Sequence, residues 1–234
     1  MKHTFFIKDW LNSFLSLLFP HCCVVCGRPL AKGEECLCIM CNINLPRTNY
    51  HLRKDNPVER LFWGQIPLER ATSFFFYRKG SDFRQILHQL KYGGKKEVGI
   101  IMGRYMAAEL LDSGFFEGVD VIIPIPLHKK KQQIRGYNQS ECIARGIAAV
   151  TGITVCVESV VRRKNTETQT RKSVFERWEN VDGIFELNHA DSLTGKHILI
   201  VDDVLTTGAT TIACASRLAE VEGTRTSVLT LAMA

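Results

Sequence analysis

The chain has 234 residues, of which 45% are hydrophobic and 23% are charged. That length allows one α/β domain with a small additional module, and the composition excludes a disordered or fibrous chain. The formal net charge of +6 suits a phosphorylated ligand or a nucleic acid, and equally a mildly basic surface. We see no stretch long and apolar enough to span a membrane, and we expect a cytoplasmic protein that is not integral to a membrane.

Residues 1–20 are expected to form an amphipathic helix. Phe6, Trp10 and Phe14 recur at helical spacing along this stretch. Lys8 interrupts the apolar run and no small-residue cleavage site follows, so the segment is not typical of an export signal. We predict that this helix packs on the rest of the protein, and the alternative is that it lies on a membrane surface.

The next segment, residues 21–47, is expected to be a small zinc ribbon. Six of the nine cysteines fall here, and four of them form two C-x-x-C pairs separated by eleven residues. Four thiolates at this spacing favour a structural zinc ion, with an iron–sulfur cluster or uncoordinated thiols as alternatives. Cys22 and Cys36 are surplus, and either could replace a neighbour as a ligand. The predicted ligands are Cys23, Cys26, Cys38 and Cys41.

Residues 48–70 show no steady periodicity and are expected to be a linker to a domain that covers 71–234. In that domain strand-like and helix-like segments alternate, which predicts an α/β fold with a mostly parallel sheet flanked by helices. The expected strands are 72–78, 119–126, 156–163, 183–187, 198–201 and 225–234. The expected helices are 82–92, 97–114, 140–152 and 209–223.

Two aspartates at the end of one expected strand mark the candidate site. The apolar run 198–201 is typical of a strand buried on both faces, and Asp202 and Asp203 are expected to end it. Neighbouring strand side chains point to opposite faces, so both acids reach one ligand only if the chain already turns at Val204. Such carboxylates can bind sugar hydroxyls or Mg²⁺. The alternative is a strand end followed by a helix cap.

The segment after the acids has the composition of a phosphate site. Gly208 permits a tight turn, and the helix that follows offers unpaired N–H groups and a positive dipole end. Hydroxyl groups come from Thr206, Thr207, Thr210 and Thr211. The three spaced glycines of a dinucleotide-binding motif and the lysine-containing loop of a P-loop protein are both missing from the sequence.

These residues resemble a known family. The stretch ILIVDDVLTTGAT is similar to the thirteen-residue signature of type I phosphoribosyltransferases. A longer succession of motifs resembles the ComF family of competence-related proteins, also called ComFC or GntX-like. It consists of the cysteine pairs, LKYGG, PLH…RGYNQS, TETQT…R…NV and this signature. The resemblance runs from about residue 20 to the end and implies a type I phosphoribosyltransferase-like domain behind a zinc ribbon.

The resemblance also implies roles for individual residues. Asp202 and Asp203 would hold the ribose hydroxyls of phosphoribosyl pyrophosphate, bound with Mg²⁺. Its 5′-phosphate would lie on the loop formed by Thr206, Thr207, Gly208, Ala209 and Thr210. The diphosphate would face a basic segment. The alternative is that this segment is a solvated loop without a ligand. Its residues are His128, Lys129, Lys130, Lys131 and Arg135. Arg171 and Arg177 lie where such enzymes keep a mobile flap.

Three functions are compatible with these features. The first is transfer of a phosphoribosyl group to an unidentified nitrogen nucleophile, a glycosyl transfer. The second, implied by the ComF resemblance, is binding of single-stranded DNA in DNA uptake and natural transformation, together with competence proteins. The third is a regulator that binds phosphoribosyl pyrophosphate without turnover. We find no recognisable base-binding element, so the sequence supports the phosphate half of a site better than the chemistry.

Overall fold

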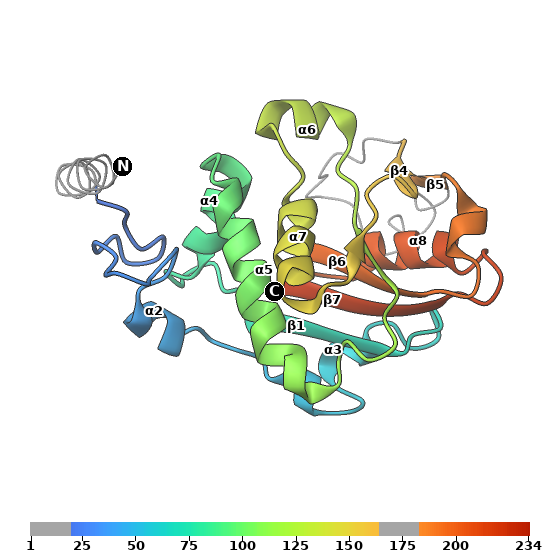
Figure 1. The fold of residues 1–234 in the computed structure, drawn as a ribbon, viewed down its shortest axis with the longest axis horizontal. Helices are drawn as coiled ribbons and strands as arrows, with labels where there is room; N and C mark the ends of the chain where they lie inside the picture. The colour runs from blue at the N-terminus through green and yellow to red at the C-terminus, as the bar shows by residue number, and fades with distance from the viewer. Residues whose placement is uncertain (1–19, 164–182) are drawn as a thin grey trace, which may run out of the picture.

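The structure is a computed structural model that describes residues 20–163 and 183–234. Its centre is a sheet with the strand order β1-β7-β6-β2-β3, in which every neighbouring pair is parallel. These strands are β1 (Arg70–Phe76), β2 (Val121–Pro124), β3 (Thr154–Val155), β6 (His197–Leu205) and β7 (Arg225–Met233). A separate antiparallel pair consists of β4 (Val160–Arg162) and β5 (Phe185–Leu187). The predicted mostly parallel α/β sheet is confirmed (Figure 1).

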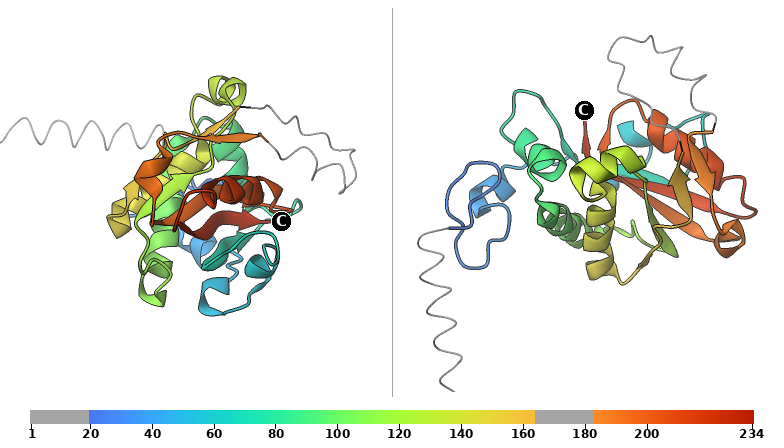
Figure 2. Two further views of the ribbon diagram at one scale, coloured as in Figure 1. Left: turned by 90° about the vertical axis from the view of Figure 1, so that its right-hand side faces the viewer. Right: turned by 90° about the horizontal axis from the view of Figure 1, so that it is seen from above.

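Helices cover both faces of the sheet (Figures 1 and 2). The described helices are α2 (Ile39–Ile43), α3 (Pro57–Arg60), α4 (Arg84–Tyr92), α5 (Lys96–Leu110), α6 (Lys129–Arg135), α7 (Gln139–Thr151) and α8 (Ala209–Leu218). Short 3-10 turns are η1 (Tyr50–Leu52), η2 (Leu111–Ser113) and η4 (Ala190–Leu193). In the described part of the chain, none of these helices combines the length and apolarity needed to cross a membrane.

The alternation of side chains along β6 explains why both faces are covered. Leu199 and Val201 pack with residues of α4, α5 and α7, whereas Ile198 and Ile200 pack with residues of α8. All four side chains are fully buried, so β6 needs an apolar residue at every position. The continuous apolar run that predicted a strand buried on both faces is therefore confirmed.

The segment 48–70, expected to be a linker, is folded onto the domain. Asn56 caps α3 by accepting hydrogen bonds from the backbone N–H groups of Val58 and Glu59. Val58 and Phe62 are fully buried in the core cluster that also contains residues of α8. Short turns rather than a long helix bring these apolar residues together, so no regular period is visible in the sequence.

Three further features differ from expectation. Strand β6 does not end at the acids, because Val204 still pairs with Ala232 and Leu205 with Met233. The basic segment after β2 forms the helix α6, where no helix is expected. The two-residue strand β3 is absent from the expected elements, since two residues carry no periodicity. The amphipathic helix predicted over residues 1–20 lies outside the described residues, apart from Pro20.

Two glycines set the distance between α5 and α7. A Cβ at Gly103 would overlap the carbonyl oxygen of Ile143, and a Cβ at Gly146 would overlap the carbonyl oxygen of Ile100. Both obstacles are backbone atoms, which cannot rotate away. The side-chain-free positions therefore let the two helices approach closely, and α7 is held where its first turn meets β6.

We expect Gly146→Ala to destabilise the protein by about 1–3 kcal/mol, the usual cost of overpacking a core. Chemical denaturation monitored by circular dichroism measures the change in the free energy of unfolding. Gly80→Ala is the control, because a Cβ at Gly80 meets nothing within 4 Å. Equal stability of the two variants would contradict this account of the helix contact.

Candidate functional site

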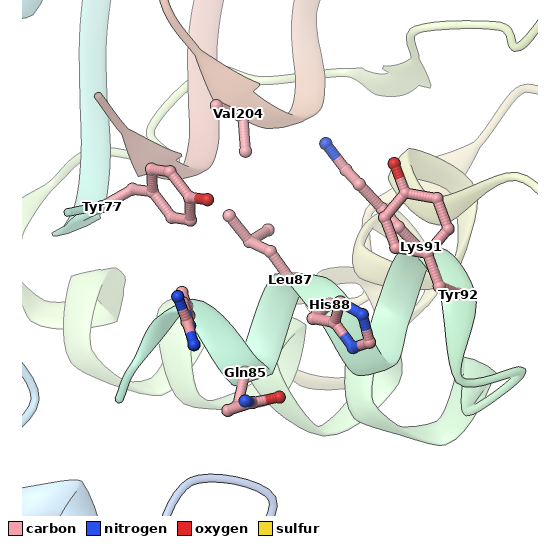
Figure 3. Close-up of a pocket in the computed structure, with 8 residues that line it drawn as sticks. Tyr77, Gln85, Leu87, His88, Lys91, Tyr92 and Val204 are labelled. Carbon is pink, nitrogen blue, oxygen red and sulfur yellow. The ribbon is translucent and has the colours of Figure 1, made fainter. Parts of the chain in front are cut away.

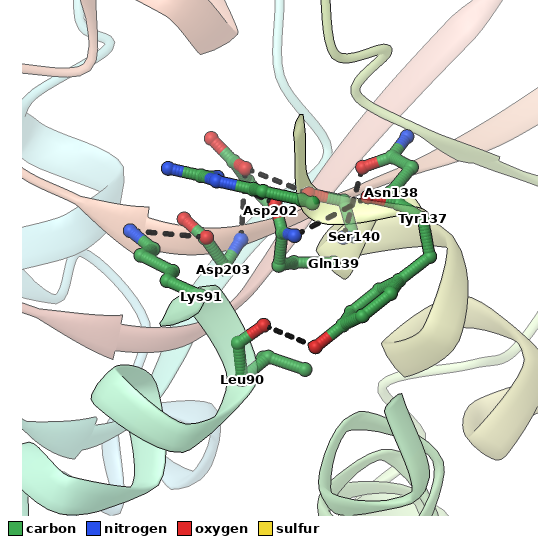
Figure 4. Close-up of polar contacts among 9 residues, drawn as sticks. Leu90, Lys91, Tyr137, Asn138, Gln139, Ser140, Asp202 and Asp203 are labelled. Atoms are coloured by element: carbon green, nitrogen blue, oxygen red, sulfur yellow. Dashed lines mark hydrogen bonds and ion pairs between the residues drawn. The ribbon is translucent and has the colours of Figure 1, made fainter. Parts of the chain in front are cut away.

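The two acids lie at the carboxyl end of β6 and contact two different helices (Figure 4). The Ser140 hydroxyl on α7 donates to Oδ1 of Asp202 at 2.9 Å. Nζ of Lys91 on α4 lies 3.0 Å from Oδ2 of Asp203. The chain does not turn at Val204 as expected. Val201 and Val204 are three residues apart, so in a regular strand their side chains would point to opposite faces of the sheet. Both instead pack against the same core cluster, so the alternation of side chains is interrupted at the acids.

Asp202 has a raised affinity for a proton. Burial, and next the charge of Asp203, raise the pKa of Asp202 to about 7. The backbone N–H of Asp203, the Ser140 hydroxyl and the Lys91 ammonium oppose this increase. Near neutral pH the Asp202 carboxyl therefore exists in both protonation states, so it can donate a hydrogen bond as well as accept one.

The predicted phosphate loop leads directly into α8. Gly208 has φ +75° and stands at the N-cap of the helix, where no side chain caps the backbone. A Cβ at Gly208 would lie 3.3 Å from the Phe62 ring, so the folded segment before β1 supports this turn. Thr206 and Thr207 are exposed. The first N–H groups of α8, which begins at Ala209 and includes Thr210, are thus available to an anion.

The basic segment forms α6, which projects from the body of the molecule above α7 (Figure 1). His128 caps it by accepting a hydrogen bond from the Lys130 backbone, and Lys129 is exposed. At the other end Arg135 donates to Gln139 at 2.7 Å and lies over the Tyr92 ring. Arg135 therefore approaches α4 and the acids, whereas His128 and Lys129 lie one helix length away.

Two residues at the acids carry no role in the sequence prediction. Lys91 belongs to the stretch LKYGG and Ser140 to RGYNQS, two of the stretches that carry the family resemblance. The Tyr137 hydroxyl, in the second stretch, donates to the Leu90 carbonyl in the first at 2.6 Å. The family resemblance was thus the one signal in the sequence that could have pointed to Lys91 and Ser140 as site residues. Only the fold shows that both stretches meet at the acids.

The four predicted cysteines come together as one cluster. The sulfur atoms of Cys23, Cys26, Cys38 and Cys41 all lie within 4.8 Å of one another. The Arg28 guanidinium contacts the sulfurs of Cys26 at 3.4 Å and Cys38 at 3.9 Å, and its hydrogen bond lowers the pKa of Cys26 to about 6. Such a cluster could hold a metal ion.

The two surplus cysteines lie outside this cluster. Cys36 is buried with its sulfur 3.9 Å from that of Met102 on α5, and burial raises the pKa of its thiol to about 12. Cys22 is exposed and donates to the Pro20 carbonyl. Arg171 and Arg177, assigned to a flap over the diphosphate, lie outside the described residues.

A parallel α/β sheet with two acids and a helix start at one strand end is the arrangement expected of a phosphoribosyltransferase-like domain. The family model "Phosphoribosyl transferase domain" matches residues 137–233. DNA utilization protein YhgH of Escherichia coli (strain K12) is 29% identical over 209 residues, which cover 83% of this chain and 88% of that protein.

Two further relatives are named as competence proteins. Competence protein ComFC of Bacillus subtilis (strain 168) is 25% identical over 199 residues, 85% of this chain and 72% of that protein. Competence protein F of Haemophilus influenzae is 34% identical over 92 residues, 39% of this chain and 40% of that protein. The chain is thus similar to ComF-family proteins, and it combines a phosphoribosyltransferase-like domain with an amino-terminal four-cysteine module.

We expect Asp202→Asn to change the pH dependence of stability. Because the pKa of Asp202 is higher in the folded state than its ordinary value of 3.8, the folded state binds more protons between about pH 4 and 7. This contribution to stability is complete below pH 4 and is lost as the pH rises to 7. Asparagine mimics the protonated form of the carboxyl. The free energy of unfolding of the variant relative to that of the wild type therefore rises between pH 4 and 7, by up to about 4 kcal/mol.

Denaturant unfolding at a series of pH values measures this difference. Asp191→Asn, which changes an exposed acid, is the matched control. A difference between Asp202→Asn and wild type that stays constant from pH 4 to 8 would contradict the assigned cause.

Proposed function

We propose that the carboxyl end of β6 binds phosphoribosyl pyrophosphate, or a related phosphosugar, together with Mg²⁺. The observation that carries this proposal is the start of α8, uncapped by any side chain and placed directly after two carboxylates. The 5′-phosphate would accept hydrogen bonds from the N–H groups of the loop over residues 206–210. The ribose hydroxyls would donate to Asp202 and Asp203.

The contacts already made by the acids are compatible with a sugar ligand. Among the described residues, both hydrogen bonds to Asp202 reach Oδ1, and a carboxylate offers about four acceptor sites. The Lys91 ammonium holds Asp203 through one oxygen, Oδ2. Ribose hydroxyls can therefore bind the remaining oxygens, or exchange with Lys91 on Asp203, without breaking the Ser140 contact.

Basic side chains would hold the diphosphate. Arg135 approaches the acids, and His128 and Lys129 at the start of α6 would have to move toward them. Arg171 is proposed for the same group. Mg²⁺ would be bound by diphosphate oxygens and a carboxylate, the oxygen ligands that this ion prefers, and it would supply charge neutralisation.

We propose that the bound phosphosugar serves phosphoribosyl transfer in a DNA-uptake pathway, as the names of the competence relatives suggest. The reacting sugar carbon gains positive charge in such a transfer, and a nearby carboxylate stabilises that charge. Asp203 would lie beside the bound sugar and would play this part. Release of diphosphate on addition of an acceptor distinguishes an enzyme from a regulator that only binds the phosphosugar.

We expect calorimetric titration with phosphoribosyl pyrophosphate and Mg²⁺ to show binding to the wild type. The change of both acids, Asp202→Asn with Asp203→Asn, weakens it at least about 100-fold, because two charge-assisted hydrogen bonds are each weakened. Asp112→Asn, at an exposed acid elsewhere, is the control. Normal binding to the double variant would disprove the site assignment.

A second candidate function is binding of single-stranded DNA. The projecting helix α6 favours it, because Lys129, Lys130 and Ile134 are exposed on it and Ile134 is 85% exposed. A positively charged projection suits the phosphates of a nucleic-acid strand. Titration with an oligonucleotide at two salt concentrations separates the candidates, since DNA binding weakens with salt and persists in the double acid variant.

We propose that the four-cysteine cluster binds a structural zinc ion. Four sulfurs within 4.8 Å of one another would fill all four positions of a tetrahedral zinc ion and leave none for a water ligand, and the Arg28 guanidinium offsets part of their negative charge. The module around them is short, so the metal would supply much of its folding free energy. The described geometry thus favours stabilisation over catalysis.

Elemental analysis is expected to find about one zinc per chain. Cys38→Ser removes a ligand and lowers both the zinc content and the melting temperature. Cys22→Ser is the matched control, since Cys22 is exposed and lies outside the cluster. Iron in place of zinc, or equal zinc loss in both variants, would contradict the assignment.

A further inference from the structure

Large apolar side chains are exposed at several places in the described part of the chain, and the two aromatic rings among them already have a partner. The guanidinium carbon of Arg60 lies 5.6 Å from the centroid of the Trp63 ring. That of Arg135 lies 5.6 Å from the centroid of Tyr92, which lines a cavity between α4 and the end of β6, beside the acids (Figure 3). Both rings are thus partly covered by cations of the same chain.

The helix α2 has an apolar face that the described residues leave in solvent. Ile39, Met40 and Ile43 are 63%, 50% and 68% exposed, so three of the five residues of this helix present apolar side chains to water. These positions share one side of the helix, and the buried Cys41 of the four-cysteine cluster lies on the other. Adjacent exposed apolar side chains, unlike single ones, are typical of an interaction surface.

The chain itself carries an apolar segment next to this module. Residues 1–19 precede the described part and lie outside it. Their sequence predicts an amphipathic helix, whose apolar stripe contains Phe6, Trp10, Phe14 and Leu17. The apolar stripe of such a helix is stable when it packs against another apolar surface.

The described chain begins close to α2. His21 lies within the module, because its carbonyl accepts a hydrogen bond from the Leu30 backbone at 2.8 Å. The chain from residue 20 to Cys23 spans at most about 11 Å when extended. The Cys23 sulfur lies within 4.8 Å of that of Cys38, the N-cap residue of α2. The preceding segment is therefore attached within reach of the apolar face of α2.

The charges beside the face also suit this segment. Glu34 lies at the start of α2, because its carboxylate accepts a hydrogen bond from the Ile39 backbone at 2.7 Å. The amino-terminal segment carries Lys2 and Lys8 against a single acid, Asp9. A basic segment next to an acidic side chain gains a small favourable interaction.

The small area of the face favours an occupant from the same chain. A stable complex between two molecules buries about 800 Å² on each partner, much more than three side chains can supply. A tethered segment needs less contact area, because its effective concentration is high and it loses little freedom on docking.

We propose that the apolar face of α2 is the docking surface for residues 1–19 of the same chain. Phe14 and Leu17, the last members of the stripe, would pack against Met40 and Ile43. The docked segment would cover the face and add apolar contacts to a module that is too short to build a core of its own.

Hydrogen exchange of the full chain, followed by mass spectrometry, tests the docking. We expect the amides of residues 10–18 to exchange about tenfold or more faster in Ile43→Glu than in the wild type, because the change removes a buried aliphatic contact. Phe14→Glu, which leaves the four-cysteine module intact, is expected to speed the exchange of the α2 amides. Ile134→Glu, at an isoleucine that is 85% exposed on α6, is the matched control.

Photocrosslinking identifies what occupies the face. Benzoyl-phenylalanine placed at position 14 is expected to crosslink to residues 39–43 of the same chain. Crosslinks between two chains would assign the face to a second copy. Sedimentation of the wild type with phosphatidylglycerol vesicles, if Phe14→Glu abolishes it, would assign the segment to a membrane surface. Either result overturns the proposal, as does exchange in residues 10–18 that Ile43→Glu leaves unchanged or that Ile134→Glu speeds equally.

Discussion

The partial burial of two adjacent carboxylates at the end of a central strand is the constraint on which the rest of the site depends. Strand β6 is covered on both faces, so the acids that follow its apolar run are partly removed from water. A partly buried charge is stabilised by polar partners, and here Ser140 and Lys91 provide them. The two helices that carry these partners must therefore reach the same strand end.

The packing of the domain meets this requirement from both faces. Gly103 and Gly146 allow α5 and α7 to approach closely, which places the first turn of α7 over the acids. On the opposite face Phe62 lies against Gly208 and supports the turn before α8. Core contacts thus fix the backbone of the candidate site, and the exposed threonines and α6 form its outer part.

The four-cysteine module attaches to the same helical layer. Cys36 packs against Met102, and Arg104 on α5 pairs with Glu35 in the module. Arg47, at the junction, pairs with Glu109 on the same helix. These contacts place the module at one end of the molecule (Figures 1 and 2). The module thus buries apolar surface against α5, which stabilises a segment too short to build a core of its own.

The sequence by itself determined the features that depend on local pattern: the alternation of strands and helices, the two C-x-x-C pairs, and the acids followed by a glycine turn. These features follow from residue types and from spacings of a few residues, both of which are visible in the sequence itself. It did not reveal the folded segment 48–70, the helix α6, or the extension of β6 through Val204, because each depends on distant packing and pairing partners. Only the tertiary structure decided that Lys91 and Ser140 meet the acids and that a cavity opens beside them, since these contacts join segments up to 112 positions apart in the chain.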